Sequence, residues 1–482
     1  MIPFDDIPRP GLWKRLLLAS VLVIFASAGA TAVAAFHEID KVVAALKLRP
    51  ALKLDKRQLA TTDPGEPQTL MILGSDHRPK NNVEGAGGAR SDTIMLVRLA
   101  PDKKAIAVLS LPRDLKVEIP GYGTDKLNAA YEAGGPELTL KTVHQLTGLP
   151  INHVINVDFS GFWRAVNAVG CVYVDIDRTY YNASGEYSYI NVPAGYQRMC
   201  GRKALQYVRF RHLDTDLVRS ARQQDFLRQA KQQIATSKLI DNRERLLKIF
   251  GRNTSTDQEL RSRKEVLRLA KLVIGTADLP IREVHFEATL GESYVEATKE
   301  QVDKVVHKFV GVQGSRGTRA TIVRKDGHRR RPRGDAGLVK DTEFGREQAL
   351  SAVQQGAGET LPVYYPTVRT SESLYVDQPR VYKIRGPDKE VYGAYRMVLK
   401  RGEALGEYYG IQGTTWKDPP ILEQPQATRR VGGRTYELHY DGARLRLVAW
   451  RTKKATYWVS NTLLLSLSKR QMMSIARSAR TL

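Results

Sequence analysis

The sequence is poor in cysteine, histidine and acidic side chains. It has two Cys and nine His among 482 residues, and 51 acidic residues face 75 basic ones, which gives a net charge of +24. The chain shows no zinc-ligand spacing, no glycine-rich P-loop and no helix-turn-helix pattern before a basic helix. These absences argue against zinc sites, P-loop nucleotide hydrolases and the common DNA-binding modules. The basic surplus predicts a polyanionic partner, which leaves nucleic acid, anionic lipid and cell-wall polymers as candidates.

Charge is also missing from residues 16–36, LLLASVLVIFASAGATAVAAF. A helix of about 20 apolar residues spans a bilayer, so we expect a retained transmembrane anchor that follows a cytoplasmic tail at residues 1–15. A cleaved signal peptide is the alternative, because Ala30, Thr31 and Ala32 resemble a small-residue cleavage site. A membrane anchor weakens the case for nucleic acid as the partner.

The two cysteines, Cys171 and Cys200, lie in the same region of the chain. Outside the cell we expect them to pair, and the closed loop would stabilise the fold by about 3 to 4 kcal/mol in the chain-entropy model. In the cytosol both would stay reduced. Two unrelated buried thiols are the alternative, since a free Cys is usually a core residue.

Composition divides the rest of the chain into four parts. Residues 37–67 combine helical apolar spacing with a polar end that contains Pro and Gly, which is typical of a stalk. A compact domain is expected over residues 68–312. Residues 313–345 hold the sequence RKDGHRRRPRGD, so we expect a basic linker. Residues 346–482 regain strand character and predict a small α+β domain of unknown role.

Strand and helix patterns alternate in the compact domain, which favours an α/β layer fold. The short apolar runs are typical of buried strands. We predict strands at 69–74, 93–99, 105–111, 171–176 and 283–286, and helices at 128–133, 137–147, 160–169, 201–207, 219–238, 257–274 and 299–310. In the last domain we predict an antiparallel sheet with aromatic core residues and a final helix at 468–480.

Carboxylates stand where apolar strands begin or end. Asp76 follows the first strand, Asp92 precedes the second, and Arg113 and Asp114 follow the third. Open sheets place their sites at such strand ends. Mg²⁺ typically takes one or two carboxylates together with phosphate oxygens and water. Ordinary turn chemistry explains each segment alone, but the three together predict a metal-pyrophosphate site.

The stretch LQYVRFRHLDTDLVRSARQQDFL crowds arginines between apolar residues. If residues 208–213 are extended, Arg209 and Arg211 project from one side. A helix that begins near Asp216 would present one polar face: Arg219, Arg222 and Gln223. Guanidinium groups grip phosphate oxygens bidentately, so this stretch predicts a phosphate or pyrophosphate site. A structural network of buried ion pairs is the alternative.

Several segments, taken in order, resemble the LytR-CpsA-Psr family of envelope phosphotransferases. They are GSDHRP, GARSDTIMLVRL, SLPRD, DKLNAAYEAGGPELTLKTVHQLTG, VDFSGFWRAVNAVGCVYVDI and LQYVRFRHLDTDLVRSARQQ. The resemblance runs from about residue 70 to residue 234 and does not cover the C-terminal domain.

The resemblance implies an α/β/α sandwich and a single-pass protein of the cell membrane, whose catalytic domain faces the wall. Family members transfer a glycopolymer with its linking phosphate from a polyprenyl pyrophosphate carrier to a hydroxyl of peptidoglycan, and Mg²⁺ assists. Teichoic acid, capsule and arabinogalactan-type polymers share that carrier, so the sequence does not identify the polymer.

Site residues follow from the resemblance motif by motif. Asp76 and Asp92 would hold the metal, and Asp216 would orient arginines or accept the proton of the attacking hydroxyl. Arg113 and Arg211 would act in catalysis. The residues expected to hold the pyrophosphate are Arg90, Arg113, Lys126, Arg209, Arg211, Arg219 and Gln223. The Cys171–Cys200 pair would be a clamp beside the site.

Two other functions stay open. A polyprenyl pyrophosphate hydrolase would use the same site with water as the nucleophile. A non-enzymatic envelope or nucleic-acid-binding regulator would explain the charge of +24 and would bind DNA with a steep salt dependence.

Overall fold

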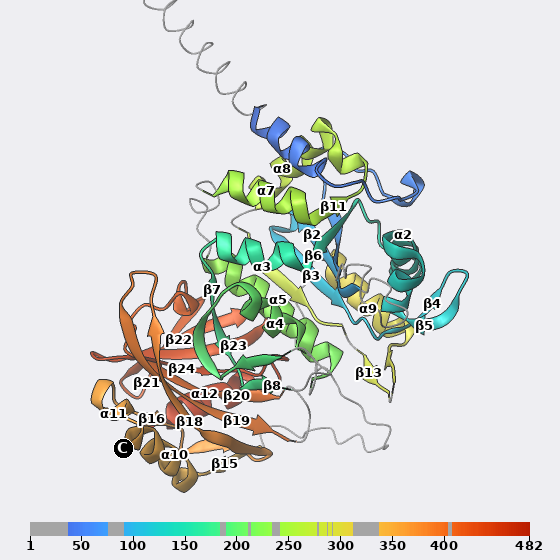
Figure 1. Ribbon diagram of the computed structural model, residues 1–482. Coiled ribbons are helices and arrows are strands. Elements are labelled where there is room, and N and C mark those ends of the chain that lie inside the picture. The colour runs from blue at the N-terminus through green and yellow to red at the C-terminus, as the bar shows by residue number, and fades with distance from the viewer. Residues whose placement is uncertain are drawn as a thin grey trace, which may run out of the picture.

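A computed structural model describes residues 37–75, 91–183, 189–210, 214–233, 242–276, 279–286, 288–291, 293–311, 337–402 and 407–482 (Figure 1). The predicted anchor at residues 16–36 lies outside these ranges. Among the helices within them, none combines the length and the apolar character needed to cross a bilayer. The described chain forms two domains that pack against each other (Figure 1).

A mixed six-stranded sheet forms the centre of the first domain, in the order β11-β6-β1-β2-β3-β12. β1 runs parallel to β6 and antiparallel to β2, and β3 runs antiparallel to β2 and parallel to β12. The strands are β1 Gln68–Ser75, β2 Ser91–Ala100, β3 Ala105–Leu111, β6 His153–Asp158, β11 Thr254–Thr256 and β12 Ile281–Val284.

Both faces of this sheet are covered, because alternate side chains of each strand point to opposite sides. Met71 and Leu73 enter one core with α2 (Leu127–Thr147) and α9 (Lys299–Val310). Leu70 points the other way, towards α8 (Arg263–Thr276). The second face also carries α3 Phe159–Ala168, α5 Asp216–Gln233 and α7 Arg243–Asn253 (Figure 1). The predicted α/β/α sandwich is therefore present.

Two local predictions in this domain have opposite outcomes. The helices predicted at 128–133 and 137–147 are confirmed as two helical stretches within α2, because the backbone leaves helical geometry at Gly134 and at Gly135, whose φ is 62°. The predicted extended start of 208–213 is wrong, because Val208 and Arg209 belong to α4 (Gly201–Arg209). Ala204, Tyr207 and Val208 are buried at helical spacing, and this apolar face decides the local structure.

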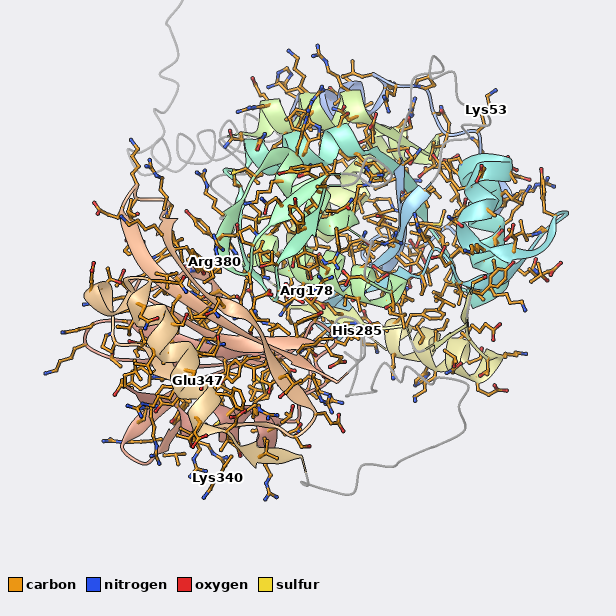
Figure 2. All side chains as sticks on the ribbon, turned by 60° about the horizontal axis from the view of Figure 1, so that its bottom comes forward. Lys53, Arg178, His285, Lys340, Glu347 and Arg380 are labelled. Atoms are coloured by element: carbon orange, nitrogen blue, oxygen red, sulfur yellow. A yellow bond between two sulfur atoms is a disulfide. The ribbon has the colours of Figure 1, made fainter. Side chains whose placement is uncertain are left out.

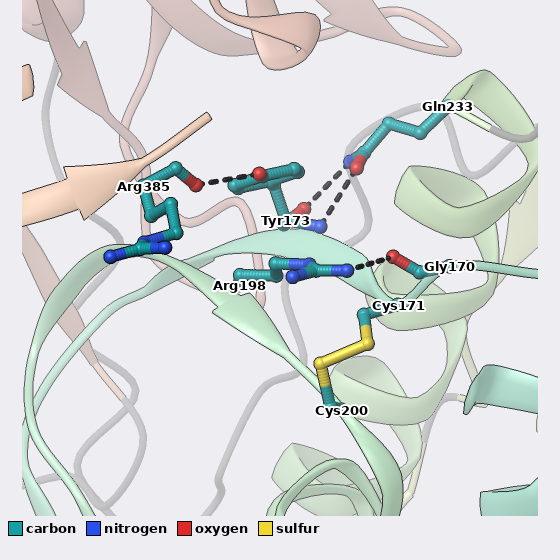
Figure 3. The surroundings of a disulfide bond; sticks show 7 residues. All are labelled: Gly170, Cys171, Tyr173, Arg198, Cys200, Gln233 and Arg385. Atoms are coloured by element: carbon teal, nitrogen blue, oxygen red, sulfur yellow. Dashed lines mark hydrogen bonds between the residues drawn. A yellow bond between two sulfur atoms is a disulfide. The ribbon is translucent and has the colours of Figure 1, made fainter. Parts of the chain in front are cut away.

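A disulfide joins the start of this helix to a neighbouring two-stranded sheet. Strands β7 (Val172–Ile176) and β10 (Gly195–Met199) pair antiparallel. The predicted bond between Cys171 and Cys200 is present, with 4.7 Å between the Cα atoms, and it links the residue before β7 to the N-cap of α4 (Figure 3). Two further short strands, β8 Tyr180–Asn182 and β9 Ile190–Val192, lie between β7 and β10 in the sequence and pair with each other.

The C-terminal domain is built on a seven-stranded antiparallel sheet, in the order β18-β19-β20-β24-β23-β22-β21. Its strands are β18 Ser373–Arg385, β19 Val391–Arg401, β20 Tyr408–Thr414, β21 Ala427–Val431, β22 Arg434–Asp441, β23 Arg444–Arg451 and β24 Thr456–Ser460. Helices α10 (Thr342–Gln354) and α12 (Lys469–Ser478) cover one face. Strand β15 (Leu338–Lys340) and the first residues of α10 occupy the end of the segment predicted as a linker.

The other face of this sheet packs against the first domain. Tyr173 on β7 and Tyr196 on β10 share one apolar cluster with Trp416 and Trp458 of the C-terminal domain. The Tyr173 hydroxyl donates to the carbonyl oxygen of Arg385 at 2.7 Å (Figure 3). Figure 2 shows Arg178, His285 and Arg380 where the two domains meet, whereas Glu347 lies on the outer helical layer.

Candidate active site

Three of the predicted site residues, Arg113, Lys126 and Arg209, lie at one edge of the six-stranded sheet. β1 and β3 end there and β2 begins there, since β2 runs antiparallel to both. The register shows this directly, because Gly74 of β1 lies opposite Thr93 of β2, and Leu111 of β3 lies opposite Ile94. β6 ends at the same edge, where Asp158 pairs with Ser75.

Arg113 and Lys126 meet at one carboxylate on this edge. The Asp114 Oδ1 atom lies 3.9 Å from Arg113 Nε and 3.6 Å from Lys126 Nζ. The backbone holds the two segments together, because the amide of Asn128 donates to the carbonyl oxygen of Arg113 at 3.0 Å. Two cations thus face one carboxylate that is 8% exposed. Guanidinium and ammonium groups placed together in this way can bind an anion at this edge of the sheet.

Arg209 reaches the same edge from the last turn of α4. Its guanidinium centre lies 4.1 Å from the centre of the Phe159 ring, at the start of α3. A Cβ added to Gly74 would stand 3.3 Å from that ring and 3.0 Å from Thr93 Cβ. Gly74, Thr93 and Phe159 are therefore in close contact, and the aromatic face holds the Arg209 cation over the end of β1.

Gln223 ties the arginine-bearing helices to the sheet. Its Nε2 atom donates to Thr93 Oγ1 at 3.1 Å and to the carbonyl oxygen of Val208 at 3.2 Å. Arg219 stands one turn earlier on α5 and is 3% exposed. The end of α4 and the start of α5 are consequently fixed against β2, with Arg209 and Arg219 on neighbouring elements.

Arg222 has a different role from the one its spacing predicted. It is fully buried, its Nη1 atom donates to the carbonyl oxygens of Tyr207 at 3.1 Å and Phe210 at 2.7 Å, and its Nη2 atom pairs with Asp214. Arg178 Nη2 donates to the same carboxylate at 2.7 Å. The alternative of a structural ion-pair network is therefore correct for this arginine.

Burial controls the titration of the groups beneath the site. It raises the pKa of the Asp177 carboxyl, although the neighbouring Arg178 guanidinium opposes that rise. It also raises the pKa of the Tyr207 hydroxyl well above its usual value. The layer under Arg209 is thus a dry environment, in which charge pairing is strong.

Other predicted site residues lie outside the described parts of the chain. Asp76, Arg90 and Arg211 belong to this group. Asp92 is placed by its backbone only, at a bulge of β2 opposite the end of β1, and Asp216 by its backbone only, as the first residue of α5. The metal site and the catalytic roles given to Arg211 and Asp216 stay predictions.

Sequence reasoning missed two residues of this region, Phe159 and Arg178. Phe159 directly follows β6, which ends at the site edge. A position just after a buried strand is the sequence signal that could have indicated Phe159 as a site residue. Arg178 follows β7 in the sequence VYVDIDR, where charged residues interrupt a buried run. Its partner Asp214 is 36 residues away, so no local pattern indicates the ion pair.

Comparisons with known proteins identify the family and several relatives of this chain. The model of the LytR_cpsA_psr family matches residues 33–309. The chain is 32% identical over 253 residues to the polyisoprenyl-teichoic acid–peptidoglycan teichoic acid transferase TagU of Oceanobacillus iheyensis, which covers 50% of this chain and 75% of that protein. It is 30% identical over 223 residues to the transferase TagT of Bacillus subtilis, covering 45% and 68%.

Among solved structures, the chain is similar to the LytR-CPS2A-psr family protein YwtF (TagT) with bound octaprenyl pyrophosphate lipid. That similarity has a TM-score of 0.38 and 24% identity, and it covers 54% of this chain and 98% of the other. The family match spans more than half of the sequence. The chain therefore belongs to the LytR_cpsA_psr family.

Proposed function

We propose that this protein transfers a phospho-glycopolymer from a polyprenyl pyrophosphate carrier to peptidoglycan. The observation that carries the proposal is the gathering of cationic side chains from separate elements at one sheet edge: Arg113, Lys126 and Arg209. Family membership supports it, because relatives of this chain are named as transferases that join teichoic acid to peptidoglycan. A pyrophosphate is the substrate group that such a cluster fits.

The reaction is a phosphoryl-centre displacement. An acceptor hydroxyl of peptidoglycan attacks the phosphorus on the polymer side, and a new P–O bond forms. The bond between that phosphorus and the bridging oxygen breaks, so polyprenyl monophosphate leaves. The hydroxyl proton goes to a base, for which Asp216 is our candidate. The arginines stabilise the negative charge on the phosphate oxygens, and such stabilisation with positioning supplies most of the catalysis in phosphoryl transfer.

The proposal includes Mg²⁺, held by Asp76 and Asp92. The donor chemistry fits, because carboxylate oxygens are the ligands that Mg²⁺ prefers. The backbone supports it too, since Asp76 follows the last residue of β1 and Asp92 lies at the bulge opposite. When bound, the ion would neutralise phosphate charge. Arg90 and Arg211 complete the proposed pyrophosphate site.

We also propose that residues 16–36 anchor the chain in the cell membrane and that both domains face the wall. A polyprenyl carrier is itself confined to the membrane, so an anchored enzyme meets its donor there. The Cys171–Cys200 bond is consistent with an oxidising compartment outside the cytoplasm. The hydrolase and regulator functions are the alternatives that the test below separates from transfer.

The test incubates the full-length chain in detergent with Mg²⁺, a polyprenyl pyrophosphate-linked glycopolymer and peptidoglycan oligomers. We expect polymer bound to peptidoglycan through a phosphodiester, with one polyprenyl phosphate released per transfer. Polyprenyl phosphate with free polymer phosphate would instead indicate a hydrolase. No turnover of any donor polymer, together with salt-sensitive DNA binding, would favour the regulator.

A further inference from the structure

The arginine-bearing helices of the site rest on the C-terminal domain. On α5, Val218 and Ala221 form an apolar cluster with Leu464 of the C-terminal domain. Arg219 and Gln223 are interleaved with these two residues on the same helix. α5 therefore lies between the site edge and the C-terminal domain, and a displacement of one surface would move the other.

The start of α5 is locked to the end of α4 beneath the site. Asp214, whose side chain is fully buried, accepts from Arg222, and Arg222 also donates to the carbonyl oxygens at the end of α4. Terminal carbonyls of a helix have no partner within the helix, so a buried guanidinium there fixes where the helix ends. The position of Arg209, the last residue of α4, depends on this lock.

An aromatic ring of the C-terminal domain contacts this lock, which consists of Asp214 and its partners Arg222 and Arg178. Arg178 donates to Asp214 at 2.7 Å, and its guanidinium centre lies 5.1 Å from the centre of the Tyr408 ring. Tyr408 is the first residue of β20 in the C-terminal domain. Tyr180 lies on the same guanidinium at 4.3 Å, so a ring from each domain contacts Arg178. Such contacts restrict the orientation of a guanidinium that must also meet a carboxylate.

A second set of contacts holds the domains at a fixed distance. Asp175 on β7 accepts from Arg396 Nη1 at 3.3 Å and from Trp458 Nε1 at 3.0 Å. Both partners are fully buried in the C-terminal sheet. A buried carboxylate with partners in the other domain is costly to expose. These contacts therefore oppose a sliding of one domain against the other.

We propose that the C-terminal domain is a positioning part of the active site. Tyr408 orients Arg178, Arg178 and Arg222 hold Asp214, and this lock sets where Arg209 and Arg219 stand. Tyr408 and Arg178 are positioning residues, because they act through Asp214 and not on the substrate. What the arginines bind rests on the proposed function, whereas the mechanical coupling does not.

The test replaces Tyr408 in the full-length chain. Tyr408→Leu keeps apolar bulk but removes the aromatic face, and Tyr408→Phe keeps that face. Tyr440→Leu is the matched control, because Tyr440 contacts Lys469 of its own domain. Three quantities are compared: amide hydrogen exchange in residues 205–210 and 214–222, the dissociation constant for inorganic pyrophosphate, and KM and kcat for the lipid-linked donor.

We expect Tyr408→Leu to speed exchange at the end of α4 and the start of α5. It should also weaken pyrophosphate binding and raise KM by roughly threefold to thirtyfold, the range of a partly buried cation–π contact. Tyr408→Phe and Tyr440→Leu should match the wild type in all three. Melting temperatures of the variants identify any loss of affinity that comes from global unfolding.

Unchanged exchange in Tyr408→Leu would overturn the coupling. Equal losses in Tyr408→Leu and Tyr408→Phe would overturn the role of the aromatic face. A wild-type chain that transfers no polymer while Tyr408→Leu still loosens α4 and α5 would contradict the proposed function and leave the coupling supported. An active wild type with a fully active Tyr408→Leu would support the proposed function and contradict the coupling.

Discussion

Arg219 and Arg222 stand three residues apart on α5 and have different surroundings. Arg222 is fully enclosed by the Asp214 carboxylate, helix carbonyls and the rings of Tyr180 and Tyr207. Arg219 lies one turn before Gln223, which contacts the site edge. The stretch that sequence reasoning treated as one anion site thus contains both a structural arginine and, in Gln223, a residue that contacts the site edge.

Arg222→Ala should destabilise the fold strongly, because it leaves the Asp214 charge and two helix carbonyls without this partner. Breaking a buried ion pair from one side costs about 3 to 5 kcal/mol. Denaturant unfolding followed by circular dichroism measures the loss, and Arg245→Ala, at an exposed position of α7, is the control. Wild-type stability in Arg222→Ala would disprove the structural role.

Glu283 should make the stability of the chain depend on pH. Burial raises the pKa of its carboxyl to about 8, and the adjacent Asp441 carboxylate adds to the rise while Arg228 opposes it. Between the ordinary glutamate pKa of 4.5 and about 8, the folded chain holds a proton that the unfolded chain releases. The stabilisation of the folded chain by the proton on Glu283 is therefore complete below about pH 4.5 and is lost as pH rises through about 8.

The variant Glu283→Gln imitates the protonated carboxyl and should remove this dependence. We expect its unfolding free energy to fall less between pH 5 and pH 8 than that of the wild type, by the linkage between protonation and stability. Exposed Glu244→Gln should follow the wild type. Parallel pH profiles for Glu283→Gln and the wild type would contradict the raised pKa.

At the scale of elements, the sequence predicted the bounds of segments that have a regular apolar pattern and clear signals at their ends. β3 and α9 have the predicted bounds, and α9 begins with a capping box between Thr298 and Gln301. The end of α4 was not predictable in this way. The sequence Val208-Arg209-Phe210-Arg211 alternates apolar and charged residues like a strand, but Val208 and Arg209 belong to a helix whose end is set by Arg222.

The disulfide fixes the other end of α4, so its removal should loosen that helix. The double variant Cys171→Ala with Cys200→Ala should lose about 3 to 4 kcal/mol of stability, as expected for a loop of this size. Unfolding with and without reductant measures the effect, and reductant should have no further influence on the variant. An equal response of both chains to reductant would contradict a structural role for the bond.

At the scale of the whole molecule, the sequence indicates two domains but not how they meet. Asp175 is separated by more than 200 residues from its partners Arg396 and Trp458. Such pairs leave no local pattern, because each residue has an ordinary place in its own strand. The place of Arg113 and Asp114 after β3 could be predicted, since both follow a buried apolar run. The buried contacts beneath them join segments that are far apart in the sequence, so only the structure shows these contacts.

The central claim is that cations at the sheet edge hold a pyrophosphate while an acceptor hydroxyl displaces it. The most direct measurement compares polymer transfer to peptidoglycan by the full-length wild type, Arg113→Ala and the exposed control Arg245→Ala, with Mg²⁺ present. We predict that Arg113→Ala transfers about 10³-fold more slowly, by analogy with arginines that stabilise phosphoryl transfer, while Arg245→Ala equals the wild type. Transfer by Arg113→Ala at the wild-type rate would contradict the account.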